Sequence, residues 1–84
     1  MKEQEKKMDE KNDLNYRRAK VFFEDKIPVH VATKRGSFYN GYILKKPTSD
    51  FFILHDRKIG YMPIFYIELK KPLVQFEGDL EELE

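Results

Sequence analysis

The stretch "KRGSFYNGYI", residues 34–43, gives the strongest structural signal in the chain because it holds two of the four glycines. Gly36 follows two cations and is expected to supply the positive φ of a tight turn. Gly41 instead interrupts a strand-forming run, at a place where β-branched residues are preferred. Because a strand bends most easily at an internal glycine, the stretch predicts a hairpin whose second strand turns a corner at Gly41.

The flanking sequence predicts four further short strands around this hairpin strand. Residues 27–34 alternate between apolar and polar side chains, which is typical of a strand with one buried face. The expected strands are residues 27–34, 38–46, 51–56, 61–67 and 72–76. Short strands joined by connections of about four residues are typical of a small antiparallel barrel. We therefore predict a mainly β fold with an N-terminal helix and a strongly bent, five-stranded, SH3-type barrel.

A single helix is expected before the strands. Asn12 or Asp13 can cap it, and it should run from Leu14 to about Asp25. Its apolar residues form one wide stripe: Leu14, Tyr16, Ala19, Val21, Phe22 and Phe23. Pro28 disfavours helical backbone in the residue before it and so ends the helix. The chain thus divides into a charged and disordered arm (1–13), a barrel domain (14–76) and an acidic tail (77–84).

Charge is distributed unevenly along these parts. The 84-residue chain has a net charge of +1, yet residues 14–76 hold 12 Lys and Arg against five Asp and Glu, an excess of seven. A basic domain beside an acidic tail is typical of proteins that bind polyanions, although a solubilising surface gives the same pattern. The chain has no cysteine, no apolar run long enough to span a membrane and no visible leader, so a cytoplasmic protein is expected.

Two of the expected strands are apolar on both faces. "FFIL" at 51–54 and "YMPIFYI" at 61–67 do not alternate, whereas a strand of a small barrel normally has one face toward water. The simplest cover for the second face is another copy of the chain, so a homo-oligomer is expected. The expected contact residues are Met62, Ile64, Phe65, Tyr66, Leu73 and Val74.

The segment "KIPVHVATKRGSFYNGYI", residues 26–43, resembles the first signature of the Sm-like proteins, including the bacterial Hfq type. The resemblance rests on a helix entering an alternating strand and on the spacing of Gly36, Gly41 and Ile43. It covers about residues 14–76. It implies a bent five-stranded barrel that assembles into a ring through its fourth and fifth strands and binds single-stranded RNA, usually near the pore on the helix-bearing face.

The chain departs from that family where RNA bases are usually read. The family's loop aspartate is replaced by Pro47 and its base-reading asparagine by Phe51, while the second signature between the last two strands is replaced by residues 66–68. Lysines can neutralise phosphates, carboxylates can accept from base edges and aromatic rings can stack on bases. The candidate RNA contacts are therefore Lys45, Lys46, Ser49, Asp50, Phe51, Tyr66, Arg17 and Arg18, although a core Phe51 with solvated lysines gives the same pattern. The sequence does not decide between U-rich and A-rich RNA.

The missing signature leaves a second interpretation open, an Sm-fold oligomer that acts as a structural or protein-interaction module without RNA. An enzyme is not expected. His55 and Asp56 are adjacent in a strand and so point to opposite faces, and His30 stands alone. Without a nucleophile, a carboxylate pair or a phosphate loop, the sequence predicts no catalytic residue, metal or cofactor.

Overall fold

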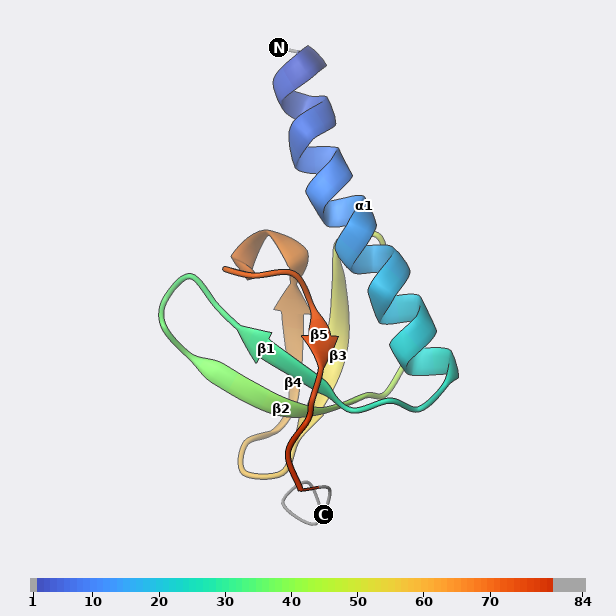
Figure 1. The fold of residues 1–84 in the computed structure, drawn as a ribbon, viewed down its shortest axis with the longest axis vertical. Helices are drawn as coiled ribbons and strands as arrows, with labels where there is room; N and C mark the ends of the chain where they lie inside the picture. Colours follow the sequence, from blue (N-terminus) through green and yellow to red (C-terminus); the bar gives the residue numbers. More distant parts are fainter. Residues whose placement is uncertain (1, 80–84) are drawn as a thin grey trace.

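The computed structural model describes residues 2–79 and, within the helix, the side chains from Asn12 onward. Across residues 2–79 the chain forms one α-helix, five strands and one 3-10 turn (Figure 1). Their bounds are α1 Lys2–Glu24, β1 Val29–Ala32, β2 Phe38–Ile43, β3 Phe51–Asp56, β4 Gly60–Phe65, η1 Tyr66–Glu68 and β5 Val74–Gln75. No helix among the described residues combines the length and the apolar character needed to cross a membrane.

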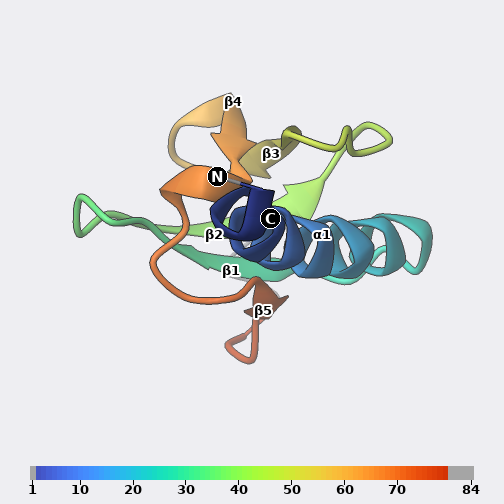
Figure 2. The ribbon, with the colours of Figure 1, turned by 90° about the horizontal axis from the view of Figure 1, so that it is seen from above.

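The five strands make one antiparallel sheet in the order β4-β3-β2-β1-β5. The prediction of a mainly β fold with an N-terminal helix and five antiparallel strands is confirmed. The expected closure into a barrel is wrong for the single chain, because β4 and β5 lie at opposite edges of the sheet. The sheet instead curls around the helix, with β3 and β4 on one side of α1 and β1 and β5 on the other (Figure 2).

Gly41 is the residue at which β2 passes from one partner strand to the other. Residues 38–41 pair with β1, and residues 41–43 pair with β3, so only Gly41 belongs to both ladders. A Cβ atom on Gly41 would lie 1.9 Å from the carbonyl oxygen of His55. The corner predicted at Gly41 therefore has a steric cause: the backbone of β3 occupies the space that a side chain would need. Gly36, in the hairpin turn, has the expected positive φ of 87°.

The helix is longer than predicted. It begins at Lys2 rather than near Leu14, so the segment expected to be a disordered arm continues the helix, and its N-terminal half extends beyond the sheet (Figure 1). Residues 2–13 favour helix by propensity even without an apolar stripe. The buried stripe is also narrower than expected, because Leu14 and Val21 are exposed while Asn15 and Ala19 are buried.

The C-terminal end of α1 is fixed by its own backbone. Ile27 N–H donates to the Phe22 carbonyl and Lys26 N–H to the Phe23 carbonyl, and Lys26 has a left-handed φ of 55°. This is the hydrogen-bond pattern of a Schellman motif, with Lys26 in the position that glycine usually takes. The motif turns the chain sharply, so that β1 starts beneath the last turn of the helix.

The core lies between α1 and the concave side of the sheet. It comprises Ala19, Val29, Val31, Ile43, Phe52, Leu54, Ile64, Tyr66, Leu69 and Leu73, with Tyr16, Phe22 and Phe23 of the helix packed against it. Every second residue of β1 and β3 points into this core, as their alternation predicts.

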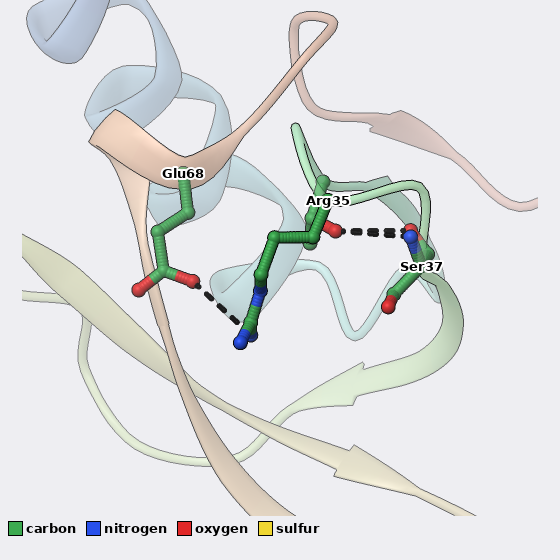
Figure 3. Close-up of polar contacts among 4 residues, drawn as sticks. Arg35, Ser37 and Glu68 are labelled. Carbon is green, nitrogen blue, oxygen red and sulfur yellow. Dashed lines mark hydrogen bonds and ion pairs between the residues drawn. The ribbon is translucent and has the colours of Figure 1, made fainter.

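The expected fourth and fifth strands are shorter than predicted. Between them, residues 68–70 pair with residues 32–34 at the end of β1. Lys34 N–H donates to the Glu68 carbonyl and Lys70 N–H to the Ala32 carbonyl. At the same place Arg35 of the β1–β2 turn points toward Glu68 of η1, with 3.9 Å between Nη2 and Oε2 (Figure 3).

Both backbone groups of Leu73 are held by the helix rather than by a strand. Its N–H donates to Asn15 Oδ1 over 2.9 Å, and its carbonyl accepts from Arg18 Nη1 over 3.0 Å. We call this pair of bonds the Leu73 clamp. It fixes the chain immediately before β5, so the position of the β5 edge depends on α1.

Candidate nucleic-acid interface

The β2–β3 loop, residues 44–50, carries half of the candidate RNA contacts and is ordered by Thr48. The Thr48 hydroxyl accepts from the N–H groups of Asp50 and Phe51, over 3.2 and 3.0 Å, and Thr48 N–H donates to the Phe51 carbonyl. These bonds close a tight turn through a side chain, as Ser and Thr do in loops. Lys45, Lys46, Ser49 and Asp50 are exposed on this loop.

Tyr66 joins the loop to η1 and to the helix. Its hydroxyl donates to the Thr48 carbonyl over 2.8 Å, its N–H donates to the Asp50 carbonyl over 3.0 Å, and its ring lies 6.3 Å from that of Tyr16. Burial raises the pKa of the Tyr66 hydroxyl well above its usual range, and the nearby Tyr16 and Asp50 raise it further. With 2% of its surface exposed, Tyr66 is a core residue and offers no ring for stacking on a base, contrary to its predicted role.

The two helix arginines proposed as phosphate contacts are differently placed. Arg17 is exposed and pairs with Asp13, with 2.9 Å between Nη2 and Oδ2. Arg18 is half-buried, and its guanidinium holds the Leu73 carbonyl. Exposed ion pairs stabilise little and exchange easily, so Arg17 can still meet a phosphate, whereas Arg18 has a structural task.

Phe51 lies on the other side of the sheet from these groups. Its ring contacts that of Phe65, with 5.1 Å between the centroids, on the face away from α1. Of the predicted set, Tyr66 and Arg18 have structural tasks, Phe51 lies on the outer face, and the remaining five are exposed on the loop and the helix: Lys45, Lys46, Ser49, Asp50 and Arg17. The sequence could not separate them, because the side on which a loop-flanking residue falls depends on the register of β3.

A Tyr16–Lys20 pair was missed in the sequence. Lys20 Nζ lies over the ring of Tyr16, 4.4 Å from its centroid, and both side chains are half-buried. Since Tyr16 contacts Tyr66, which is bonded to Thr48, the pair lies close to the β2–β3 loop. Their i, i+4 spacing was the available signal. We call Tyr16, Lys20, Thr48 and Asp50 the helix–loop cluster.

The residues predicted to join copies are partly internal. Ile64, Tyr66 and Leu73 are buried within the chain and Met62 is half-buried, so these four belong mainly to the core of one chain. Phe65 and Val74 are exposed, at the two opposite edges of the sheet.

The histidines and Asp56 have local partners. Asp56 is buried and accepts from the N–H groups of Lys58 and Ile59, which closes the β3–β4 turn. His55 packs on Tyr61, and His30 on Phe38. Among the described residues, no group of three His, Asp or Glu side chains is arranged to hold a metal ion.

Replacing Tyr66 by Phe should lower the free energy of unfolding at neutral pH. It should also remove part of the fall in that free energy at alkaline pH. The lost hydrogen bond costs about 0.5–1.5 kcal/mol. In the wild type the folded state keeps the hydroxyl protonated, while the unfolded chain ionises near pH 10, so the free energy of unfolding falls by about 1.4 kcal/mol per pH unit above that value.

Urea titrations at pH 7 to 11.5 test this prediction. The difference in the free energy of unfolding between wild type and Tyr66→Phe should keep its full size below pH 10 and shrink above it. A difference that stays constant up to pH 11.5 would contradict the burial argument.

Comparison of the chain with protein-family models, with curated proteins and with solved structures gave no match.

Proposed function

We propose that the protein is an Sm-like subunit of a closed ring, in which β4 of one copy pairs with β5 of the next, and that the ring binds single-stranded RNA. The observation that carries the proposal is the open sheet with β4 and β5 at its two edges. A ring joined through the fourth and fifth strands is what the Sm-like resemblance of residues 26–43 implies.

The backbone groups at both edges are oriented for such pairing. Phe76 N–H donates to the Pro28 carbonyl, so by alternation Val74 also bonds toward β1 and Gln75 faces the open edge. Tyr66 N–H donates to the Asp50 carbonyl. By the same alternation along β4, the backbone groups of Phe65 and Pro63 face the open edge of the sheet. Pro63 has no N–H, so it costs the β3–β4 ladder nothing but offers the next copy only its carbonyl, and the N–H donors of this edge are those of Tyr61 and Phe65.

The side chains at the edges favour cover by another chain. Phe65 is 39% exposed and Val74 is 42% exposed. A free edge with exposed apolar side chains is a template for further strand pairing, and a head-to-tail contact that closes into a ring removes both edges at once.

The proposed RNA site is the helix–loop cluster with the cations around it. Lys20, which lies over the half-buried ring of Tyr16, and the exposed Lys45, Lys46 and Arg17 supply positive charge. The Asp50 carboxylate can accept from a base edge. One such site binds weakly, but a strand that meets several subunits in turn gains from each of them.

Charge reversal in the β2–β3 loop should abolish RNA binding without dissociating the ring. The measurement is fluorescence anisotropy with labelled oligo-U, oligo-A and DNA of equal length, in 50–500 mM salt. For single strands, log K should fall by about 0.7 for each phosphate contact per decade of salt. The test variant is Lys45→Glu/Lys46→Glu. The matched control is Lys70→Glu/Lys71→Glu, the same reversal on two exposed lysines before β5.

If both double variants bind RNA equally well, the β2–β3 loop is not part of the RNA site. A wild-type ring without affinity for any oligonucleotide at 50 mM salt would favour the second interpretation, a structural or protein-interaction module.

A further inference from the structure

The side of the sheet away from α1 carries an apolar surface, of which the proposed ring would cover only the edge at Phe65. The side chains of β3 and β4 that point outward are Phe51, Ile53, His55, Tyr61, Pro63 and Phe65, which we call the outer β3–β4 face. Their neighbours in β3, residues 52, 54 and 56, are buried on the opposite side. The rings pair across the strands, Phe51 with Phe65 at 5.1 Å and His55 with Tyr61 at 4.9 Å between centroids.

This face has neither Lys, Arg, Asp nor Glu among its six residues. Tyr61 is 71% exposed and Phe65 39% exposed, and Pro63 is also exposed. On a scale of about 150–250 Å² per aromatic side chain, the six residues leave on the order of 500 Å² in contact with water. A patch of this size is at the upper end for a monomer and is typical of a binding surface.

Its chemistry favours a dry apolar partner over a nucleic acid. A platform for single strands needs cations along the path of the phosphates. Here the nearest sequence cations are Lys45 and Lys46 at one end and Arg57 and Lys58 at the other, all in loops beyond the strands. The rings also already contact one another, and Ile53 and Pro63 lie between the two aromatic pairs.

We propose that the outer β3–β4 faces of two copies pack against each other as a two-fold, sheet-on-sheet contact. An uncharged face that meets its own copy buries no ionic group, and two such surfaces together remove on the order of 1,000 Å² from water, the area that a specific interface requires. Crossing the two sheets near a right angle keeps the basic loop ends of the copies apart.

The contact uses a face of β4 and not its edge, so it is independent of the proposed ring. Two rings would join into a double ring, and two single chains into a dimer. Because the loop ends of both copies are basic, added salt should strengthen the contact, whereas it weakens binding to a nucleic acid.

The test is the mass of Tyr61→Lys measured by light scattering or native mass spectrometry beside the wild type. A lysine on the face would have to be buried without a partner, so we expect the mass to halve. Val21→Lys is the matched control, since Val21 is 51% exposed but lies on α1, and it should keep the wild-type mass. Equal masses for the wild type and Tyr61→Lys overturn the proposal.

A second measurement on the unmodified protein covers the case in which Tyr61→Lys fails to fold. Tyr61 is the most exposed tyrosine of the single chain, because the other four are half-buried or buried. Its nitration by tetranitromethane should slow as the protein concentration rises, while that of half-buried Tyr16 should not. Nitration of Tyr61 at a constant rate, or its protection only when an oligonucleotide is added, overturns the proposal, the latter in favour of base stacking.

Discussion

Gly41→Ala should unfold the protein or come close to doing so. The added Cβ would lie 1.9 Å from the His55 carbonyl oxygen and 2.8 Å from its carbon, both of them backbone atoms that cannot rotate away. Relief requires β2 and β3 to separate at the one residue that both ladders of β2 share. A loss of about 4 kcal/mol or more is expected, against a total stability of roughly 4–12 kcal/mol for a domain of this size.

Circular dichroism and urea unfolding measure this effect, and Gly36→Ala is its control. Gly36 has open space around it but a φ of 87°, so alanine there should cost only about 1–2 kcal/mol for the left-handed backbone. If Gly41→Ala were less destabilising than Gly36→Ala, the steric account of the β2 corner would fail.

Gln75→Pro should dissolve the proposed ring while each subunit stays folded. Gln75 faces the open edge of β5, so a proline there removes an N–H that β4 of the next copy needs and spares the β1–β5 bonds. The expected result is the loss of every β4–β5 contact, seen by sedimentation as a fall from a closed ring to single chains, or to dimers joined through the outer β3–β4 face.

Gln75→Ala keeps the N–H and should keep the ring, which makes it the matched control. Combining Gln75→Pro with Tyr61→Lys should leave monomers, because the edge and the face are then both blocked. A wild-type protein that is monomeric at micromolar concentration, or a Gln75→Pro protein that still forms rings, would contradict assembly through the strand edges.

Most of the fold could be predicted because its signals are local. The alternation of residues 27–34, the glycine spacing of the hairpin and the short connections all act over a few residues, so the strands and their order along the chain follow from the sequence. The ends of elements were harder to predict. The helix continues to Lys2 on propensity alone, and the strand expected over 61–67 becomes η1 after Phe65.

The candidate site was less predictable because it depends on contacts between distant residues. Tyr66 was expected on the surface, yet the 3-10 turn directs its ring inward and its hydroxyl to Thr48, 18 residues away. Phe51 was grouped with the loop lysines, but the register of β3 places it on the outer face beside Phe65. Neither outcome follows from residue type or from spacing, since both require the folded path of the chain.

The Leu73 clamp has a consequence for the order of events during synthesis. Asn15 and Arg18 leave the ribosome early, but the backbone they hold follows 58 and 55 residues later. Closing so long a loop is slow compared with forming the local hairpins, so the β5 edge is expected to be completed last. A nascent chain that already carries β4 then lacks the finished edge to which a neighbour would bind. In the proposed ring, this delay would keep partly made subunits on one messenger RNA from joining each other before they have folded.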